Sequence, residues 1–258
     1  MKIIFEIYYH TRWGESLFLS GDIDELGANE ENRAVMMDYQ GDGLWKYTME
    51  LPASAKKFHY EYLVKSGEGI RREWGSPHSF SPGRNAGKYR LVDRWRDVPA
   101  NLPFYSSAFI QGIFFRQHAD SVVETIEQGT FTVKVDAPQL RPDERLGMVG
   151  DCPELGDWDV LKAPLLNDSA FPEWQITLDG RQLKFPFEYK FVIVRTHQRE
   201  VVAWETGENR ICREKPQNPS EAVVVSGLRF NGSESQWRGA GTAIPVFSLR
   251  TDYGFGIG

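Results

Sequence analysis

Four aromatic side chains stand where burial in a core is hard to arrange. Trp158 lies in a turn rich in Gly and Asp, Trp204 lies between an alanine and a glutamate, and Trp13 precedes a glycine in a polar loop. Tyr39 lies in a short polar stretch, where it can also be a plain turn residue. The chain holds eight Trp among 13% aromatic residues. Because a large ring offers a flat apolar face, rings in excess of what a core needs suggest binding platforms.

Other chemistries find little support in the sequence. The five histidines have no metal-ligand spacing, and the two cysteines do not form a Cys-x-x-Cys pair. We find no Gly-rich phosphate loop, no Gly-x-Ser-x-Gly elbow and no Cys-x5-Arg phosphatase loop. We therefore expect no catalytic residues, no metal and no cofactor in this chain.

Composition excludes several classes of partner. The net charge is −6 and the basic residues do not cluster, so nucleic acid is not expected. No apolar run reaches the roughly 18–20 residues of a membrane span. The first residues are typical of a strand rather than a signal peptide, which predicts a cytoplasmic protein. Cys152 and Cys212 leave one disulfide open, although a reduced pair is simpler.

The elements that carry these residues belong to an internal repeat. The run Gly-Asp-Ile-Asp-Glu-Leu-Gly at 21–27 returns as Gly-Asp-Cys-Pro-Glu-Leu-Gly at 150–156. A repeat of this length indicates a duplicated domain rather than a solenoid. Three more pairs keep nearly the same spacing: Trp45 with Trp174, Tyr60 with Tyr189, and Trp74 with Trp204.

The sequence predicts β-structure in both copies. Alternating or aromatic-rich runs predict strands, and Gly-rich turns separate them. Several short strands per hundred residues favour antiparallel sandwiches, with Trp45 and Trp174 in their cores. We expect a first domain at 1–95, a packed linker at 96–128 with an apolar run at 108–115, and a second domain at 129–230. The expected strands are 3–9, 16–20, 44–50, 57–65 and 88–92, then 130–136, 145–150, 173–178, 185–194, 200–204 and 222–226.

Residues 150–209 resemble the starch-binding domain of carbohydrate-binding module family 20. The resemblance rests on Leu-Gly-Asp-Trp-Asp at 155–159, Phe-Glu-Tyr-Lys-Phe at 187–191, Trp-Glu at 204–205 and Asn209. It implies two immunoglobulin-like β-sandwiches in tandem, each with up to two glucan sites. The partner it implies is an α-glucan: starch, glycogen, a maltooligosaccharide or a cyclodextrin.

The resemblance also implies which residues form the first glucan site. They are Trp158, Trp204, Lys190 and Asn209, with Glu188 and Glu205 as polar helpers. The residue types suit the ligand, because a glucose ring presents a flat C–H face and a rim of hydroxyls. Indole rings stack on that face, while amine, amide and carboxylate groups hydrogen-bond the rim.

The first copy departs from this pattern. Asn29 stands where the second copy has Trp158, and Glu61 stands where it has Lys190. Of the stacking pair only Trp74 remains, and we favour a packing role for it over sugar binding. The first glucan site is therefore not expected in this copy.

The second glucan site shows the opposite distribution. The family places aromatics in the first inter-strand loop and before the Leu-Trp strand, where the first copy has Trp13 and Tyr39. The second copy has Pro142 and Asp168 at those positions, with Phe171 nearby as a possible substitute. We expect the second copy to keep site one and the first copy to keep site two.

The C-terminal residues look like the opening of another domain. The run Ala-Ile-Pro-Val-Phe-Ser-Leu-Arg at 243–250, followed by a Gly-rich stretch, resembles the first barrel strand of the family 77 glycoside hydrolases, the 4-α-glucanotransferases. We expect 231–258 to be a linker and the truncated start of a TIM barrel. The two carboxylates of such an enzyme would come from later strands, so this chain itself would be inactive. The alternative is a protein-interaction or spacer module that docks onto its own catalytic barrel or a second subunit.

Overall fold

The computed structural model describes residues 1–83, 87–97, 125–137 and 140–232. These residues form strands joined by loops and by short 3-10 turns, so the all-β prediction is confirmed. The apolar run at 108–115 and the expected barrel strand at 243–250 lie outside the described residues. The 3-10 turns are η1 (Asp24–Leu26), η2 (Glu31–Arg33) and η4 (Pro153–Leu155).

The strands form three sheets. The largest has eight strands in the order β12 (Asn167–Ala170), β13 (Glu173–Asp179), β10 (Thr130–Asp136), β17 (Ala222–Arg229), β9 (Lys88–Arg94), β1 (Lys2–Tyr8), β5 (Leu44–Glu50) and β4 (Asp38–Gly41). The second contains β11 (Glu144–Gly150), β14 (Phe187–Arg195), β15 (Val201–Trp204) and β16 (Arg210–Cys212). The third contains β3 (Val35–Met36), β2 (Ser16–Gly21), β6 (Phe58–Ser66), β7 (Gly69–Arg72) and β8 (His78–Phe80).

Side-chain alternation explains where the two cores lie. On β1, Ile3, Phe5 and Ile7 point into one buried cluster, which β2, β6 and β8 cover. The second cluster lies between β10, β13 and β17 on one side and β11, β14 and β16 on the other. Trp45 is 6% exposed and Trp174 is 2% exposed, which confirms both as core residues.

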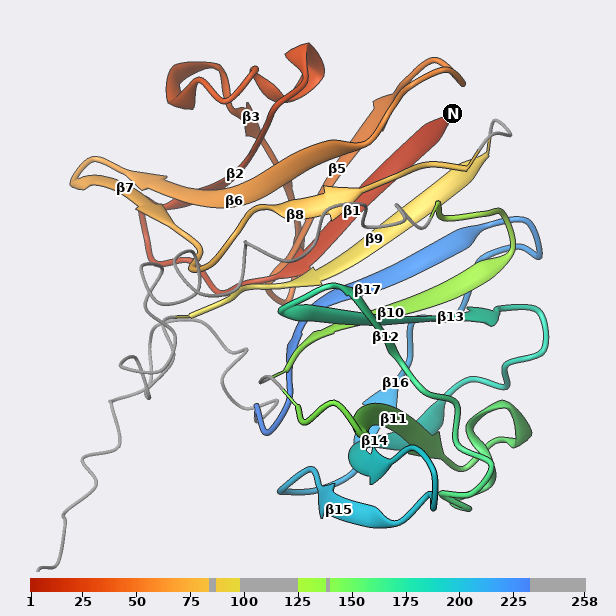
Figure 1. Cartoon of the computed structure of the whole chain (residues 1–258). Helices are drawn as coiled ribbons and strands as arrows, with labels where there is room; N and C mark the ends of the chain where they lie inside the picture. The colour runs from red at the N-terminus through yellow and green to blue at the C-terminus, as the bar shows by residue number, and fades with distance from the viewer. Residues whose placement is uncertain (84–86, 98–124, 138–139, 233–258) are drawn as a thin grey trace, which may run out of the picture.

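The two copies share the eight-stranded sheet. Strand β17 of the second copy pairs in parallel with β9 of the first, and Figure 1 shows these two strands side by side in the middle of the molecule. Ala222 and Val224 face the first core, whereas Val223 and Val225 face the second. Because neighbouring side chains on a strand point to opposite faces, the two smaller sheets cover opposite faces of the shared sheet.

A buried polar cluster lies where β17 meets the first copy. Asp93, which is fully buried, accepts hydrogen bonds from the hydroxyls of Tyr60 (2.9 Å) and Tyr62 (2.5 Å) and from Ser226 of β17. His78 lies 3.0 Å from the Ser226 hydroxyl through Nδ1. Since buried polar groups are costly when unpaired, this cluster fixes the position of β17.

Ion pairs hold the opposite face of the same junction. The segment after β16 crosses β9, where Arg94 pairs with Glu214 at 2.6 Å and Arg90 donates to the carbonyl of Lys215 at 2.5 Å. Lys88 pairs with the buried Glu221 at 2.9 Å. The junction between the copies is therefore closed on both faces of the shared sheet.

Candidate functional site

Trp158 lies in the turn that follows η4, and its backbone is hydrogen-bonded to the end of β11. Asp157 and Trp158 adopt left-handed φ values of 51° and 64°, and the Trp158 N–H donates to the carbonyl of Gly150 at 2.7 Å. Gly150 must lack a side chain, because a Cβ there would lie 2.4 Å from the carbonyl oxygen of Glu188. Leu155 fills the core beneath the turn, so the indole of Trp158 remains outside at 36% exposure.

The first copy builds the same turn with a different side chain. Ala28 and Asn29 have φ values of 49° and 63°, and the Asn29 N–H donates to the carbonyl of Gly21 at 2.6 Å. The backbone has therefore been retained while the indole has been replaced by an amide. The expected loss of the first stacking residue in this copy is confirmed.

Strand β14 supplies the floor of the site. Phe187, Tyr189 and Phe191 point into the core, which leaves Glu188 and Lys190 on the outer face of the sheet. The ammonium of Lys190 donates to two backbone carbonyls, Glu205 at 3.2 Å and Gly207 at 2.5 Å. Lys190 therefore lies against the loop that follows β15.

Trp204 and Asn209 lie on either side of that loop. Trp204 pairs with Val192 across β14–β15, and because directly opposed residues share a face, its ring points outward with Lys190. Trp204 is 43% exposed. The Asn209 amide donates to the Glu188 carboxylate at 2.8 Å. The structure thus gathers these predicted residues on one outer surface, with the Trp158 turn at the adjoining end of β11.

Glu205 departs from its predicted role as a polar helper at the ligand. It is 3% exposed, its carboxylate forms an ion pair with Arg210, and it accepts the Phe191 N–H at 3.2 Å. It supports the loop from inside and does not face the surface. Arg210 was absent from the sequence prediction, and its only signal was the alternation of β16, which places Arg210 and Cys212 inward.

The strand register also changes one expected pairing between the copies. Arg72 lies opposite Leu63 on β6, as Trp204 lies opposite Val192 on β14, so the counterpart of Trp204 is Arg72 and not Trp74. The matching Trp letters were misleading because the hairpin after β14 is longer than the one after β6.

Two neighbouring residues of the first copy fit this register. Glu73 accepts the Tyr62 N–H at 3.1 Å, as Glu205 accepts that of Phe191. Trp74 packs beneath the guanidinium of Arg229 from the second copy, 5.5 Å from its ring centre. The favoured packing role of Trp74 is confirmed.

Ion pairs replace the stacking surface in the first copy. Arg72 forms salt bridges with Glu61 and with Glu31. Glu61 is the counterpart of Lys190, so both the charge and the aromatic partner of that position have changed. The place that Trp204 takes in the second copy therefore carries a charged side chain instead of an indole ring.

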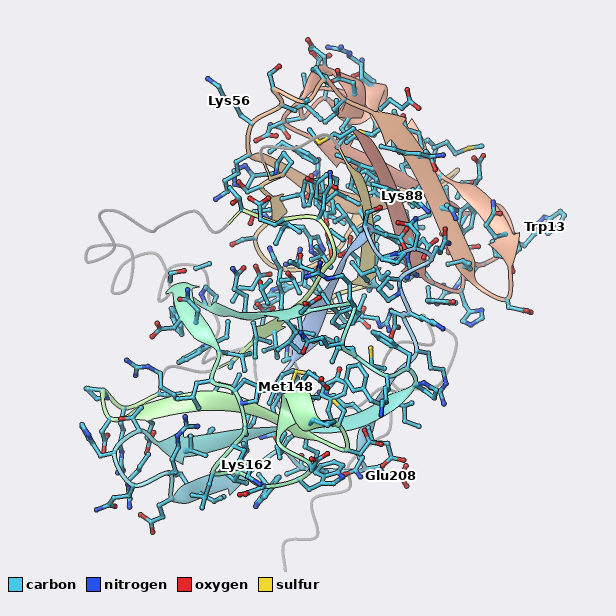
Figure 2. The ribbon with its side chains drawn as sticks, turned by 90° about the vertical axis from the view of Figure 1, so that its right-hand side faces the viewer. Trp13, Lys56, Lys88, Met148, Lys162 and Glu208 are labelled. Atoms are coloured by element: carbon cyan, nitrogen blue, oxygen red, sulfur yellow. The ribbon has the colours of Figure 1, made fainter. Side chains whose placement is uncertain are left out.

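The two aromatics expected at site two are at the surface of the first copy. Trp13, in the loop between β1 and β2, is 104% exposed, and Figure 2 shows it projecting away from the ribbon. Tyr39 on β4 is 56% exposed, and its ring lies 5.1 Å from that of Trp45. The Tyr39 hydroxyl accepts the Gly43 N–H at 3.2 Å, which fixes its orientation.

In the part of the chain that the structure describes, no group of three or more His, Cys, Asp or Glu could hold a metal ion. Among the described residues no helix has the length and apolarity needed to cross a membrane. Cys152 and Cys212 are free and buried, as the reduced reading predicted, and burial raises the pKa of the Cys152 thiol to about 11.

Comparison with known proteins identifies the family of the chain. The starch binding domain model of carbohydrate-binding module family 20 matches residues 1–85 and 128–223. The chain belongs to this starch-binding family. The starch-binding chain is 28% identical to the 4-alpha-glucanotransferase DPE2 of Oryza sativa subsp. japonica over 284 residues, which covers 100% of this chain and 29% of the rice protein. It thus spans less than a third of the length of that relative.

More distant relatives of the starch-binding chain were also found. It is 32% identical over 73 residues to the AA13 family lytic polysaccharide monooxygenase A of Aspergillus terreus, covering 27% of this chain and 18% of that protein. The family 20 module of the maltotetraose-forming amylase from Pseudomonas saccharophila is 19% identical, with a TM-score of 0.31, over 38% of this chain and 99% of that structure. The Hypocrea jecorina glucoamylase is 21% identical, with a TM-score of 0.33, over 37% of this chain and 17% of that structure. Because these TM-scores are low, the assignment of the chain to the starch-binding family rests on the match to the family model.

Proposed function

We propose that this chain binds α-glucan through the outer surface of the second copy. The observation that carries the proposal is a set of residues on one surface: the exposed Trp204, Asn209 and Glu188 and the half-buried Lys190 around β14, with Trp158 at the adjoining turn. Family membership supports the same ligand.

The arrangement suits a helical glucan chain. Two indole faces carried on different elements can stack on successive glucose units, because their orientations are set independently by the β11 turn and by β15. Lys190 and the Asn209–Glu188 pair supply donors and acceptors for the hydroxyl rim. We expect a Kd between about 1 μM and 1 mM for this site, which corresponds to about −8 to −4 kcal/mol.

We further propose that the chain comprises two sandwich domains, 1–95 and 129–230, that act as one rigid binding unit. The parallel β9–β17 pair and the buried cluster around Asp93 support this division of the fold. Trp13 and Tyr39 would form a second and separate glucan site on the first domain. A long glucan chain that is bound at one site is held close to the second site. The effective concentration of glucan at the second site is therefore raised, even when each site alone is weak.

We also propose that the chain is the binding part of a longer 4-α-glucanotransferase. The rice relative carries that name, and this chain covers 29% of it. Transfer of glucosyl or glucan units would then belong to a catalytic barrel beyond the described residues. The cytoplasmic location stays a prediction.

Co-sedimentation with insoluble starch tests the binding proposal. The chain should sediment with starch granules and should remain in solution with cellulose, whose β-linked chain is straight. Free β-cyclodextrin should release it from the granules. A chain that stays in solution with starch would refute the proposal.

One observation favours a second function for the first copy. The Arg72–Glu61 and Arg72–Glu31 ion pairs occupy the surface of the missing site, so this copy also fits a spacer role. A variant with Trp13→Ala and Tyr39→Ala separates the two functions. Unchanged glucan binding by this variant would make the first copy a spacer.

A further inference from the structure

The loop between β15 and β16 positions most of the proposed glucan site. Trp204 precedes it, Asn209 ends it, and two of its carbonyls hold the ammonium of Lys190. A small displacement of this loop would therefore move three of the ligand-facing groups together. What fixes the loop also fixes the site.

Asn231 holds the loop from outside the two strands that it joins. Its side-chain oxygen Oδ1 accepts both the backbone N–H of Thr206 at 2.8 Å and the Thr206 hydroxyl at 3.2 Å. Asn231 itself has a left-handed φ of 61°, which Asn tolerates better than most residues. It follows the end of β17, and its side chain reaches Thr206 from there.

The segment around Asn231 is itself anchored. Arg210 donates to the carbonyl of Arg229 at 2.8 Å and to that of Gly232 at 3.0 Å. The same guanidinium pairs with Glu205 inside the loop. The loop and the segment after β17 are thus fixed to one buried cation, and Asn231 closes the arrangement at its exposed end.

The first copy fixes the corresponding loop in a different way. There the residue after the buried glutamate, Trp74, donates its N–H to the backbone carbonyl of Arg96 at 2.8 Å. In the first copy the acceptor is thus a backbone carbonyl after β9, whereas in the second copy it is the side chain of Asn231 after β17. The family match ends at residue 223, so Asn231 lies outside it.

We propose that Asn231 is a positioning residue of the second copy's glucan site, acting as the hydrogen-bond acceptor that holds Thr206. The proposal rests on the proposed glucan binding. Thr206 donates in both hydrogen bonds to Asn231. The role therefore requires the side-chain oxygen of Asn231 as acceptor and does not require its amide nitrogen. The left-handed backbone must be preserved in any variant that tests it.

Two variants separate the acceptor from the backbone. Asn231→Gly keeps the left-handed conformation and removes the acceptor, whereas Asn231→Asp keeps an oxygen at the same place. Isothermal titration with maltoheptaose, in the Trp13→Ala plus Tyr39→Ala background, reports on the second copy alone. We expect a Kd about tenfold weaker for Asn231→Gly, which corresponds to about 1.4 kcal/mol, and a Kd within about twofold of the background for Asn231→Asp.

Amide hydrogen exchange at Thr206 gives a readout that does not need a ligand. It should become faster in Asn231→Gly and remain slow in Asn231→Asp. Equal binding by Asn231→Gly and its background, or equal weakening by both variants, would overturn the proposal. If the background chain binds no maltoheptaose, that result counts against the glucan site itself. Exchange at Thr206 would then decide alone whether Asn231 holds the loop, and unchanged exchange in Asn231→Gly would overturn that role.

Discussion

Replacing Asp93 by Ala should destabilise both copies together. Asp93 is fully buried and accepts from three hydroxyls, those of Tyr60, Tyr62 and Ser226. In Asp93→Ala the Ser226 hydroxyl can turn to Nδ1 of His78, 3.0 Å away, but the two tyrosine hydroxyls lose their acceptor. Each donor left unpaired in a buried site costs about 1–3 kcal/mol, so the two tyrosines give about 2–6 kcal/mol. The upper end of this range is comparable to the whole stability of an ordinary domain.

Asp93→Asn is the matched control, because the structure lets an amide satisfy the same groups. Both tyrosines donate to Oδ2, which an amide oxygen can replace. The amide nitrogen would then donate to the Ser226 hydroxyl, which can in turn donate to Nδ1 of His78, 3.0 Å away. We expect this variant to cost about one hydrogen bond, about 1 kcal/mol.

Urea denaturation, followed by tryptophan fluorescence and by far-UV circular dichroism, measures both variants. Because Ser226 belongs to the second copy and the tyrosines to the first, both probes should report one shared transition in the unmodified chain. Equal losses in Asp93→Ala and Asp93→Asn, or a loss below about 1 kcal/mol in Asp93→Ala, would refute this account of the junction.

Three further outcomes follow from the structure. Gly227→Ala should destabilise the chain by at least about 1–2 kcal/mol in the same urea assay, because φ there is 75° and a Cβ would lie 2.3 Å from the Arg94 carbonyl; a neutral change would contradict the close approach of β17 to β9. Burial and the neighbouring charge of Glu173 raise the pKa of Asp136 to about 6, so its protonated form stabilises the fold at low pH and up to about 3 kcal/mol is lost as the pH rises from about 4 through about 6; Asp136→Asn should flatten that slope. The two buried cysteines should react with a thiol reagent only after unfolding, and rapid labelling of the native chain would contradict their burial.

Much of the fold follows from side-chain patterns in the sequence. Strands with buried alternating residues, such as β1, β10 and β14, lie within one or two residues of the predicted ranges. The short strands β4, β7 and β12 were missed, since they are mostly polar and exposed and form only because a longer neighbour offers backbone groups to pair with.

The shared sheet was beyond what the pattern could predict. Strand β17 has the continuous apolar run of a strand buried on both faces, Ala-Val-Val-Val. Such a run indicates a central position but does not identify the neighbouring strand. The choice of β9 depends on groups far apart in the chain, among them Asp93 and Ser226.

The site could be predicted in its exposed residues but not in its support. The local motif identifies Trp158 and Trp204, and both are exposed. The role assigned to Glu205 failed for a reason that strand geometry explains. Adjacent residues on an extended chain point to opposite faces, so an outward Trp204 forces Glu205 inward. Asn231 lies outside the motif at 150–209, and nothing in the sequence around it indicates a role in the site.

The most direct test of the central claim is isothermal titration of the chain with maltoheptaose before and after Trp158→Ala plus Trp204→Ala. The account predicts that this pair removes the binding of the second copy and leaves only a weaker event, which Trp13→Ala plus Tyr39→Ala then removes. Unchanged affinity and stoichiometry after loss of both indoles would contradict the claim that the second copy binds glucan on this surface.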